Sequence, residues 1–312
     1  MQAAALLVAL RAKGEAADEI AGFALSLRNA CISIGPWPEA IDTAGTGGDK
    51  LGTFNVSTAS AIIVSGSAKV AKHGNRGASS KSGSADLLEA LGYNIYVQPH
   101  EVGKLLESPG FAFLFAQQYH PAMRDIAPVR RSLGIRTIFN VLGPLINPAG
   151  VRKQVIGVFS SDFMHPIAEA LLSLGAENTY LVHGYPGMDE VSISGSTKVI
   201  RVRRKRYEEF EITLDDLKVK EPVSLNKLTV SSPEESALKL IRALKGKDQD
   251  VRNFIRANAA LALMAAERVS DASDGVELAE VLVENGYKTL EQVISSHGNP
   301  ERLAELTEVV DR

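Results

Sequence analysis

Glycine, hydroxyl and carboxylate side chains gather in one stretch, Ile41–Thr58, with the sequence IDTAGTGGDKLGTFNVST. After a short apolar run come Gly45, Gly48 and Asp49, and a helix-like run, Ala59–Val64, follows. Glycines let the backbone turn tightly and bring N–H groups close to an anion, and a helix N-terminus adds unpaired N–H donors. The pattern indicates a phosphate cradle, with an ordinary tight turn as the alternative. Its spacing matches neither the P-loop nor the dinucleotide fingerprint.

A second polar stretch, Lys72–Ser84, repeats this arrangement with the sequence KHGNRGASSKSGS. It follows a strand-like run, Ala68–Ala71, and precedes a helix expected over about 86–91. Three cations lie among its glycines and serines, so it is again suited to an anion. Two such loops in succession indicate a ligand with phosphates at both ends.

A pair of adjacent acids, Asp189 and Glu190, follows the turn HGYPG at the end of an expected strand. Two neighbouring carboxylates in a loop are more often solvated surface than a binding site. For Asp49, the structural alternative is a turn residue that closes the glycine loop. We favour a functional role for Asp49, because a carboxylate in a loop suited to phosphates needs a hydrogen-bonding or metal-binding reason.

The elements that must position these residues alternate along the chain. Helices are expected over 3–12 and 15–31, the second with an apolar stripe of Ile20, Phe23, Ala24, Leu27 and Cys31. From 41 to 115, strands and helices alternate, with strands at 94–97 and 111–115 closing the series. This alternation predicts a parallel α/β sheet, whose ligands gather beyond the strand carboxyl ends.

Prolines cut residues 118–150 into short helical pieces, and sheet elements resume at 154–159 and 179–183 around a helix of about 13 residues. A β-rich stretch is expected over 191–212. Ser232, Pro233 and Glu235 form a capping box that begins a helix, and three or four more helices finish the chain.

The 312 residues suffice for about two domains, and the hydrophobic content of 45% with 23% charged residues is that of a soluble globular protein. The net charge of −3 argues against a general nucleic-acid binder. A single cysteine, Cys31, indicates a reducing compartment. Met1–Leu10 lacks the features of a signal peptide. We therefore expect a soluble, cytoplasmic protein.

Four motifs carry a resemblance to a known family: GTGGD, the NVST box, KHGNR followed by SSKSGSADLLEALG, and VRRSLGIRTIFNVLGPLINP. The chain resembles the anthranilate phosphoribosyltransferases of tryptophan biosynthesis over nearly its whole length. The resemblance implies a nucleoside phosphorylase class-II-like fold, with a small, mostly N-terminal helical domain and a larger α/β domain around a mostly parallel sheet. The helical domain would comprise 1–38, completed by about 118–150, and the phosphoribosyl pyrophosphate-binding domain would comprise 39–117 and 151–312.

The resemblance also implies a reaction and its partners. The phosphoribosyl group of phosphoribosyl pyrophosphate would pass to the amine of anthranilate, with magnesium as cofactor, in a homodimer joined through the helical domain. Members of the family usually begin with a further helix and part of the next. We expect a homodimer here too, with Leu6, Leu7 and Leu10 near or in its interface.

Site residues follow by matching the family motifs position by position. Phosphoribosyl pyrophosphate would be held by Gly45, Gly48, Asp49, Thr53, Asn55, Val56, Ser57, Thr58, Lys72, His73, Gly74, Asn75, Arg76, Gly77, Ala78, Ser79, Ser80 and Ser84. Magnesium would be bound by Ser57, Asp189 and Glu190, and anthranilate by Gly45, Asn75 and Arg130. Arg131 and Arg136 are neighbouring alternatives to Arg130 as the partner of the anthranilate carboxylate. His73 is expected near the aromatic ring.

No general base is expected, because a neutral aryl amine attacks without one. Two other functions remain as alternatives. A pyrimidine nucleoside phosphorylase of the same fold would need neither the carboxylate-binding Arg130 nor the acid pair, and a nucleic-acid-binding relative would show a basic surface. The basic run 201–206 fits an exposed strand edge better than a nucleic-acid patch. His100, His120, His165 and His297 have no metal-ligand spacing and are interpreted as structural.

Overall fold

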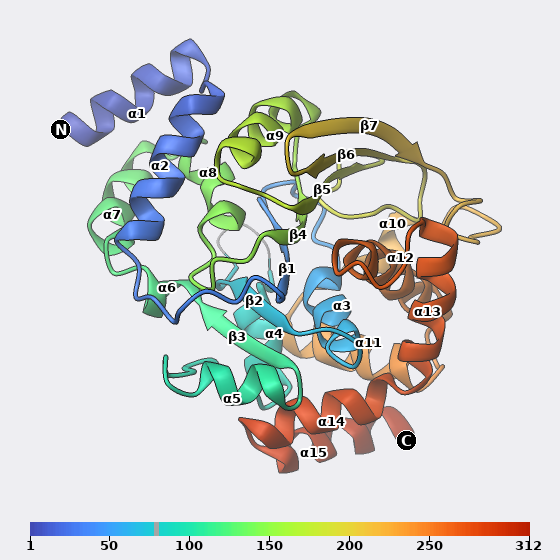
Figure 1. Ribbon diagram of the computed structural model, residues 1–312. Helices are drawn as coiled ribbons and strands as arrows, with labels where there is room; N and C mark the ends of the chain where they lie inside the picture. Colours follow the sequence, from blue (N-terminus) through green and yellow to red (C-terminus); the bar gives the residue numbers. More distant parts are fainter. Residues whose placement is uncertain (78–80) are drawn as a thin grey trace.

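The computed structural model describes residues 1–77 and 81–312 and has a central sheet with helices on both faces (Figure 1). The strands are β1 (Ile41–Gly45), β2 (Val70–Gly74), β3 (Phe111–Phe115), β4 (Lys153–Gly157), β5 (Asn178–Gly184), β6 (Thr197–Arg203) and β7 (Arg206–Ile212). The seven strands lie in the order β3-β2-β1-β4-β5-β6-β7. The first five pair in parallel and the last two antiparallel, so the sheet is mostly parallel, as predicted.

The helices before β4 are short or lie at the N-terminus. They are α1 (Gln2–Lys13), α2 (Ala17–Asn29), α3 (Val56–Val64), α4 (Ser84–Ala90), α5 (Val102–Glu107), α6 (Ala116–Tyr119), α7 (Met123–Leu133), α8 (Phe139–Leu142) and the 3-10 turn η1 (Gly143–Ile146). After β4 come η2 (Ser161–Phe163), α9 (Met164–Ser173), α10 (Leu225–Leu228), α11 (Pro233–Leu244), α12 (Gln249–Ala265), α13 (Ala272–Glu284), α14 (Gly286–Ser296) and α15 (Pro300–Asp311).

Two hydrophobic clusters, one on each face of the sheet, pack the helices against it. The larger one joins one face of the sheet to α3, α11, α12 and α13. The smaller one contains Leu7, Ile20 and Leu142 with residues of α9 and the opposite sheet face. Figure 1 shows α1 and α2 beside α7 and α8, so the N-terminal helices contact the segment before β4, and α2 also packs against α9.

Burial along α2 follows the predicted stripe: Ile20 and Ala24 are fully buried, and Phe23 and Leu27 pack against the same cluster. The predicted cap at Ser232 is present, because its hydroxyl accepts a hydrogen bond from the Glu235 backbone N–H at 3.1 Å. The basic run 201–206 covers the end of β6, which pairs with both β5 and β7, the turn, and the first residue of the edge strand β7. Only Arg206 therefore lies on the edge strand, and the expectation of an exposed strand edge is met only at the end of the run.

One predicted strand, at 94–97, is wrong. Among the described residues, this segment forms no ladder, and only Tyr93 pairs, in an isolated bridge with Gly298. Ile95 and Val97 are buried because the extended segment packs side chains onto the core. The alternation of apolar residues therefore correctly indicated which side chains are buried. It was not enough to predict a strand, because a strand also requires a neighbouring strand to pair with.

The strand order creates the position for a site. From β1 the chain proceeds outward to β2 and β3, and then returns to place β4 on the other side of β1. This reversal is a topological switch point, where loops after neighbouring parallel strands diverge and leave a crevice. The loops after β1 and β2 both leave the sheet at that carboxyl edge.

Candidate active site

The loop after β1 turns through two glycines with left-handed backbone angles, Gly47 at φ 68° and Gly48 at φ 87°. Side chains rarely adopt such angles, so glycine suits both positions. The Asp49 carboxylate accepts a hydrogen bond from the backbone N–H of Leu51 at 3.1 Å, as a turn residue does. Its second oxygen is buried and has no partner among the described residues. Asp49 therefore closes the turn and also leaves a carboxylate oxygen available inside the site.

The Asp189–Glu190 loop folds back over the carboxyl ends of β1 and β4. Asp189 is 8% exposed, and its carboxylate accepts a hydrogen bond from the Gly47 backbone N–H at 2.7 Å. A Cβ at Gly45 or at Gly157 would collide with Asp189, so both strands end in glycine where the acid loop approaches. The acid pair is thus not solvated surface.

The carboxyl groups of this loop are electrostatically crowded. Burial, followed by the charge of Asp49, raises the pKa of Asp189 to about 7. Burial and the neighbouring Asp189 raise the pKa of Glu190, whereas Lys72 and the Ser57 backbone N–H lower it. Crowded carboxylates with an unpaired oxygen fit a divalent cation, because the cation removes both the repulsion and the missing contact.

Ser57 lies in the first turn of α3, half-buried, and its carbonyl accepts a hydrogen bond from the Thr43 hydroxyl at 2.8 Å. Within the part of the chain that is described, no group of three His, Cys, Asp or Glu side chains has metal-ligand geometry. Magnesium does not need such a group, since it usually takes one or two carboxylates and completes its shell with water and phosphate oxygens.

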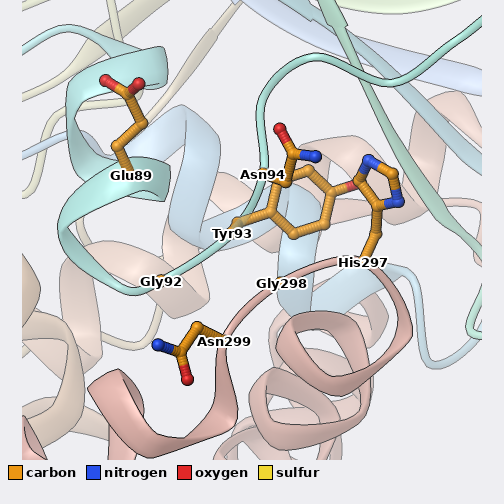
Figure 2. Close-up of a pocket in the computed structure, with 7 residues that line it drawn as sticks. All are labelled: Glu89, Gly92, Tyr93, Asn94, His297, Gly298 and Asn299. Carbon is orange, nitrogen blue, oxygen red and sulfur yellow. The ribbon is translucent and has the colours of Figure 1, made fainter.

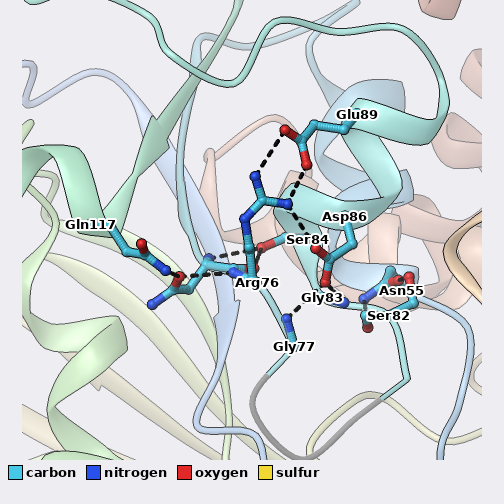
Figure 3. Close-up of polar contacts among 10 residues, drawn as sticks. Asn55, Arg76, Gly77, Ser82, Gly83, Ser84, Asp86, Glu89 and Gln117 are labelled. Atoms are coloured by element: carbon cyan, nitrogen blue, oxygen red, sulfur yellow. Dashed lines mark hydrogen bonds and ion pairs between the residues drawn. The ribbon is translucent and has the colours of Figure 1, made fainter. Parts of the chain in front are cut away.

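The second glycine loop begins at the end of β2 and is tied to the first. Asn55, which precedes α3, donates from its side chain to the Ser82 carbonyl at 3.0 Å and accepts from the Ser82 hydroxyl at 2.8 Å (Figure 3). Asn75 is exposed and its side-chain oxygen accepts from the Gln117 amide at 3.2 Å. Three residues predicted to bind phosphoribosyl pyrophosphate, Ala78, Ser79 and Ser80, lie outside the described residues.

Of the remaining predicted residues, Thr53 forms an isolated bridge with Thr229, Ser84 begins α4, and the others lie in the first turn of α3, in β2 or directly after it. Val56 and Thr58 are buried in α3, and the Thr58 hydroxyl has no partner among the described residues. Lys72 is 1% exposed, and its ammonium group donates to the Thr43 carbonyl. Burial lowers the pKa of Lys72, while Asp42 and Glu190 act in the opposite direction.

A buried polar network beneath both loops was not foreseen from the sequence. The Asp42 carboxylate accepts from the Asn147 side chain at 2.8 Å and from the His73 backbone N–H at 3.2 Å. Burial raises the pKa of Asp42 to about 6, against the opposing charge of Lys72. The available signal was an acid inside a strand expected to be buried; nothing local marked Asn147.

His73 and His120 form a second buried pair, with ring centroids 5.0 Å apart. The His73 Nδ1 is 3.2 Å from the Gly143 carbonyl, and Nε2 of both rings is without a hydrogen bond among the described residues. Burial lowers the pKa of His73 to about 3 and that of His120 to about 4. Both rings are therefore neutral near pH 7.

The three candidate arginines differ in their surroundings. Arg136 donates to the Gly48 carbonyl and stacks 4.1 Å from the centroid of the Phe159 ring. Arg131 is exposed. Arg130 is half-buried, 5.4 Å from the Phe139 ring centroid, and makes no hydrogen bond or ion pair to any described residue. Burial lowers the pKa of Arg130. Arg130 is thus the one of the three with a partly desolvated and unused guanidinium fork.

A separate pocket of about 550 Å³ lies between the end of α4 and the turn before α15 (Figure 2). Glu89, Tyr93 and His297 are among its lining residues. None of the lining residues belongs to the two glycine loops or the acid pair, so this pocket is distinct from the candidate active site.

Two anion-suited loops at a switch point, faced by an acid pair, are typical of an α/β protein that binds a phosphorylated ligand. Residues 37–289 match the glycosyl transferase family α/β domain, and residues 1–31 match the helical bundle domain of the same family. The chain is 51% identical over 299 residues to the anthranilate phosphoribosyltransferase of Saccharolobus islandicus, covering 96% of this chain and 86% of that protein. It is 47% identical to that of Sulfolobus acidocaldarius, covering 100% of this chain and 91% of that protein. The chain belongs to the anthranilate phosphoribosyltransferase family.

Solved structures agree with this assignment. The anthranilate phosphoribosyltransferase of Thermus thermophilus superposes with a TM-score of 0.88 at 41% identity, covering 94% of this chain and 89% of that one. The Saccharomyces cerevisiae enzyme in complex with PRPP and Mg gives a TM-score of 0.85 at 32% identity, covering 94% and 84%. The predicted family and fold class are confirmed.

Proposed function

We propose that this protein transfers the phosphoribosyl group of phosphoribosyl pyrophosphate to the amine of anthranilate, giving N-(5-phosphoribosyl)anthranilate and pyrophosphate. The observation that carries this proposal is the contact of the Asp189 carboxylate with the glycine loop at Gly47. It brings carboxylates, backbone N–H groups and a helix N-terminus to one edge of the sheet. Charge developing on a leaving pyrophosphate would be stabilised there.

Different groups of the chain would bind different parts of the donor substrate, phosphoribosyl pyrophosphate. The N–H groups at the start of α3, and those of the glycine loops that do not already bond Asp49, Asp86 or Asp189, would bind phosphate oxygens. Ser57, Asp189 and Glu190 would hold magnesium, which fits the crowded carboxylates and the unpaired Asp49 oxygen. Magnesium supplies positive charge that screens the pyrophosphate as its bond to the ribose lengthens.

Arg130, Asn75 and Gly45 would bind the acceptor. The partly buried Arg130 fork is free to pair with the anthranilate carboxylate, and a desolvated arginine binds such an oxyanion more strongly than an exposed one. The His73 ring, which was expected near the aromatic ring of anthranilate, is neutral and is buried against His120. An aryl amine is neutral and attacks without a strong general base, so position is the main requirement.

A direct assay tests the function. Purified protein is mixed with anthranilate, phosphoribosyl pyrophosphate and magnesium, and the fluorescence of anthranilate is followed. We expect it to disappear only when all three are present. Persistent fluorescence, together with phosphate-dependent cleavage of a pyrimidine nucleoside, would replace the proposal with the phosphorylase alternative.

The assembly and location are also proposals. No described helix is both long and apolar enough to span a bilayer. We expect the protein to act in the cytoplasm, as a homodimer joined through α1 and α2. The exposed apolar side chains Leu6, Val8, Leu25 and Ile32 lie on or next to these helices. The expectation for Leu7 and Leu10 changes, because both are buried within the chain and only Leu6 is exposed.

A further inference from the structure

The second glycine loop is closed at its base by one carboxylate. Asp86, in the first turn of α4, accepts hydrogen bonds at 2.8 Å from the backbone N–H of Gly77 and from that of Gly83 (Figure 3). Both bonds end on the same oxygen, Oδ2. A single side chain therefore holds together the two ends of the loop.

A second contact lies next to this one. The Asn75 backbone N–H donates to the Ser84 hydroxyl at 3.1 Å, and the Asn75 carbonyl accepts from the Ala85 N–H at 3.2 Å. A Cβ at Gly83 would fall on the backbone of Gly77. The end of β2 and the start of α4 thus approach as closely as their backbones allow, which requires glycine at position 83.

The guanidinium of Arg76 is directed to the outside of this junction. It donates to the other Asp86 oxygen at 3.2 Å and to both Glu89 oxygens, one of them at 2.9 Å. Its Cζ lies 5.7 Å from the centroid of the Phe115 ring. A phosphate could bind the Arg76 guanidinium only by displacing two carboxylates, because these already accept its hydrogen bonds and neutralise its charge.

We propose that Arg76, Asp86 and Glu89 are positioning residues that fix the ends of the phosphate-binding loop before the substrate arrives. Glu89 orients Arg76, Arg76 orients Asp86, and Asp86 holds the backbone of Gly77 and Gly83. Arg76 then acts through these contacts and does not bind phosphate with its side chain. The inference rests on the proposed function, in which this loop receives phosphoribosyl pyrophosphate. Loop ends that are held together before binding lose less conformational freedom when the ligand binds, which favours affinity.

A double-mutant cycle tests the chain of contacts. The variants Arg76→Gln, Glu89→Gln and the double variant are compared by the KM for phosphoribosyl pyrophosphate, the KM for anthranilate and the affinity for magnesium pyrophosphate measured by calorimetry. Glu89→Gln should raise the KM for phosphoribosyl pyrophosphate roughly threefold, in the range of a partly exposed ion pair. The double variant should be no worse than Arg76→Gln alone, and the KM for anthranilate should stay within about twofold.

Direct binding of phosphate by Arg76 would give a different result in the same cycle. If Arg76 binds phosphate directly, Glu89→Gln leaves the KM for phosphoribosyl pyrophosphate unchanged or lowers it, and Arg76→Gln costs the same factor with or without Glu89. Additive effects of this kind overturn the proposal. Asp86→Asn, which removes a charged acceptor from two backbone amides, should raise the same KM roughly tenfold or more.

Glu280 supplies the matched control, because it pairs with Arg252 and Arg256 between α12 and α13, away from the loop. Glu280→Gln should change neither KM, and thermal unfolding reports whether each variant folds. Binding of magnesium pyrophosphate separates the two proposals. A wild-type protein that binds it but does not consume anthranilate would reject the proposed function alone. If the wild-type protein consumes anthranilate but Glu89→Gln leaves the KM for phosphoribosyl pyrophosphate unchanged, only this inference is rejected.

Discussion

The Asp189 carboxylate accepts a hydrogen bond from the Gly47 backbone N–H, 142 positions away in the chain, at 2.7 Å. This contact joins the loop after β5 to the loop after β1, across β4. It leaves no room for a side chain at Gly45 or Gly157. The acid pair and the phosphate cradle are therefore one structural unit, and changes to either loop should affect the other.

Replacement of the acid pair should separate catalysis from stability. The double variant Asp189→Asn/Glu190→Gln should lose most activity, by roughly a hundredfold or more if electrostatic stabilisation of the leaving group is lost. Since the pKa of both carboxyls is raised in the fold, their charged forms are disfavoured and neutral substitutes should leave Tm unchanged or higher. Unaltered magnesium dependence of the remaining rate would contradict the assignment. Glu177→Gln, at a surface pair with Arg152, is the control.

Magnesium affinity should depend on pH. Asp189 has a pKa of about 7 in the metal-free protein, so below that pH a bound magnesium ion must displace a proton. The apparent affinity should rise with pH through about 7, with a slope of at least about tenfold per pH unit on the acid side, and the raised pKa of Glu190 acts in the same direction. Calorimetry between pH 5.5 and 8 in roughly half-unit steps measures it. The Asp189→Asn variant should show a shallower dependence, and a flat wild-type profile would refute the prediction.

The choice among the three arginines predicts a split between substrates. Arg130→Gln should raise the KM for anthranilate by about 10–150-fold, because a charged hydrogen bond of roughly 1.5–3 kcal/mol is lost. The KM for phosphoribosyl pyrophosphate should change far less. The exposed neighbour Arg131 gives the control variant, Arg131→Gln, which should be near wild type. Equal weakening for both substrates would assign Arg130 to the fold or to the phosphates.

The buried histidines should make the protein sensitive to acid. The folded pKa of His73, about 3, lies below the usual 6.5. Its contribution to stability is complete above pH 6.5 and is lost as the pH falls toward 3, because the unfolded chain takes up a proton that the folded chain refuses. At pH 4.5 this loss is on the order of 2–3 kcal/mol. Urea unfolding at pH 7 and 4.5 should show a smaller pH effect in His73→Gln than in wild type; an equal effect in both would contradict the prediction.

Dimer formation should depend on the exposed apolar side chains of α1 and α2. The double variant Leu6→Glu/Leu25→Glu should be monomeric by light scattering at concentrations where the wild type is dimeric, because two charges would be buried without partners. Val309→Glu, at a side chain 53% exposed on α15, is the control and should remain dimeric. A wild-type protein with a monomeric mass at every concentration would contradict the proposed homodimer.

The sequence by itself determined the local features of this protein. The two glycine loops, the helix starts after them and the Ser232 cap were predicted because turn conformation and capping depend on residues within a few positions. The parallel sheet followed from the alternation of elements. The predicted strand at 94–97 was wrong because alternation of buried side chains does not specify a pairing partner, and among the described residues the neighbouring Tyr93 forms just one isolated bridge, with Gly298.

Only the tertiary structure decided which distant groups meet. The strand order placed β4 between β1 and β5 and so brought Asp189 onto Gly47, a contact that the position of the acid pair in a loop did not predict. Burial distinguished Arg130 from Arg131, and the bond of Arg136 to the Gly48 carbonyl distinguished Arg130 from Arg136. The fold also revealed the unforeseen contact between Asp42 and Asn147. These outcomes depend on how buried strands and helices pack across the whole chain, and no local spacing encodes that packing.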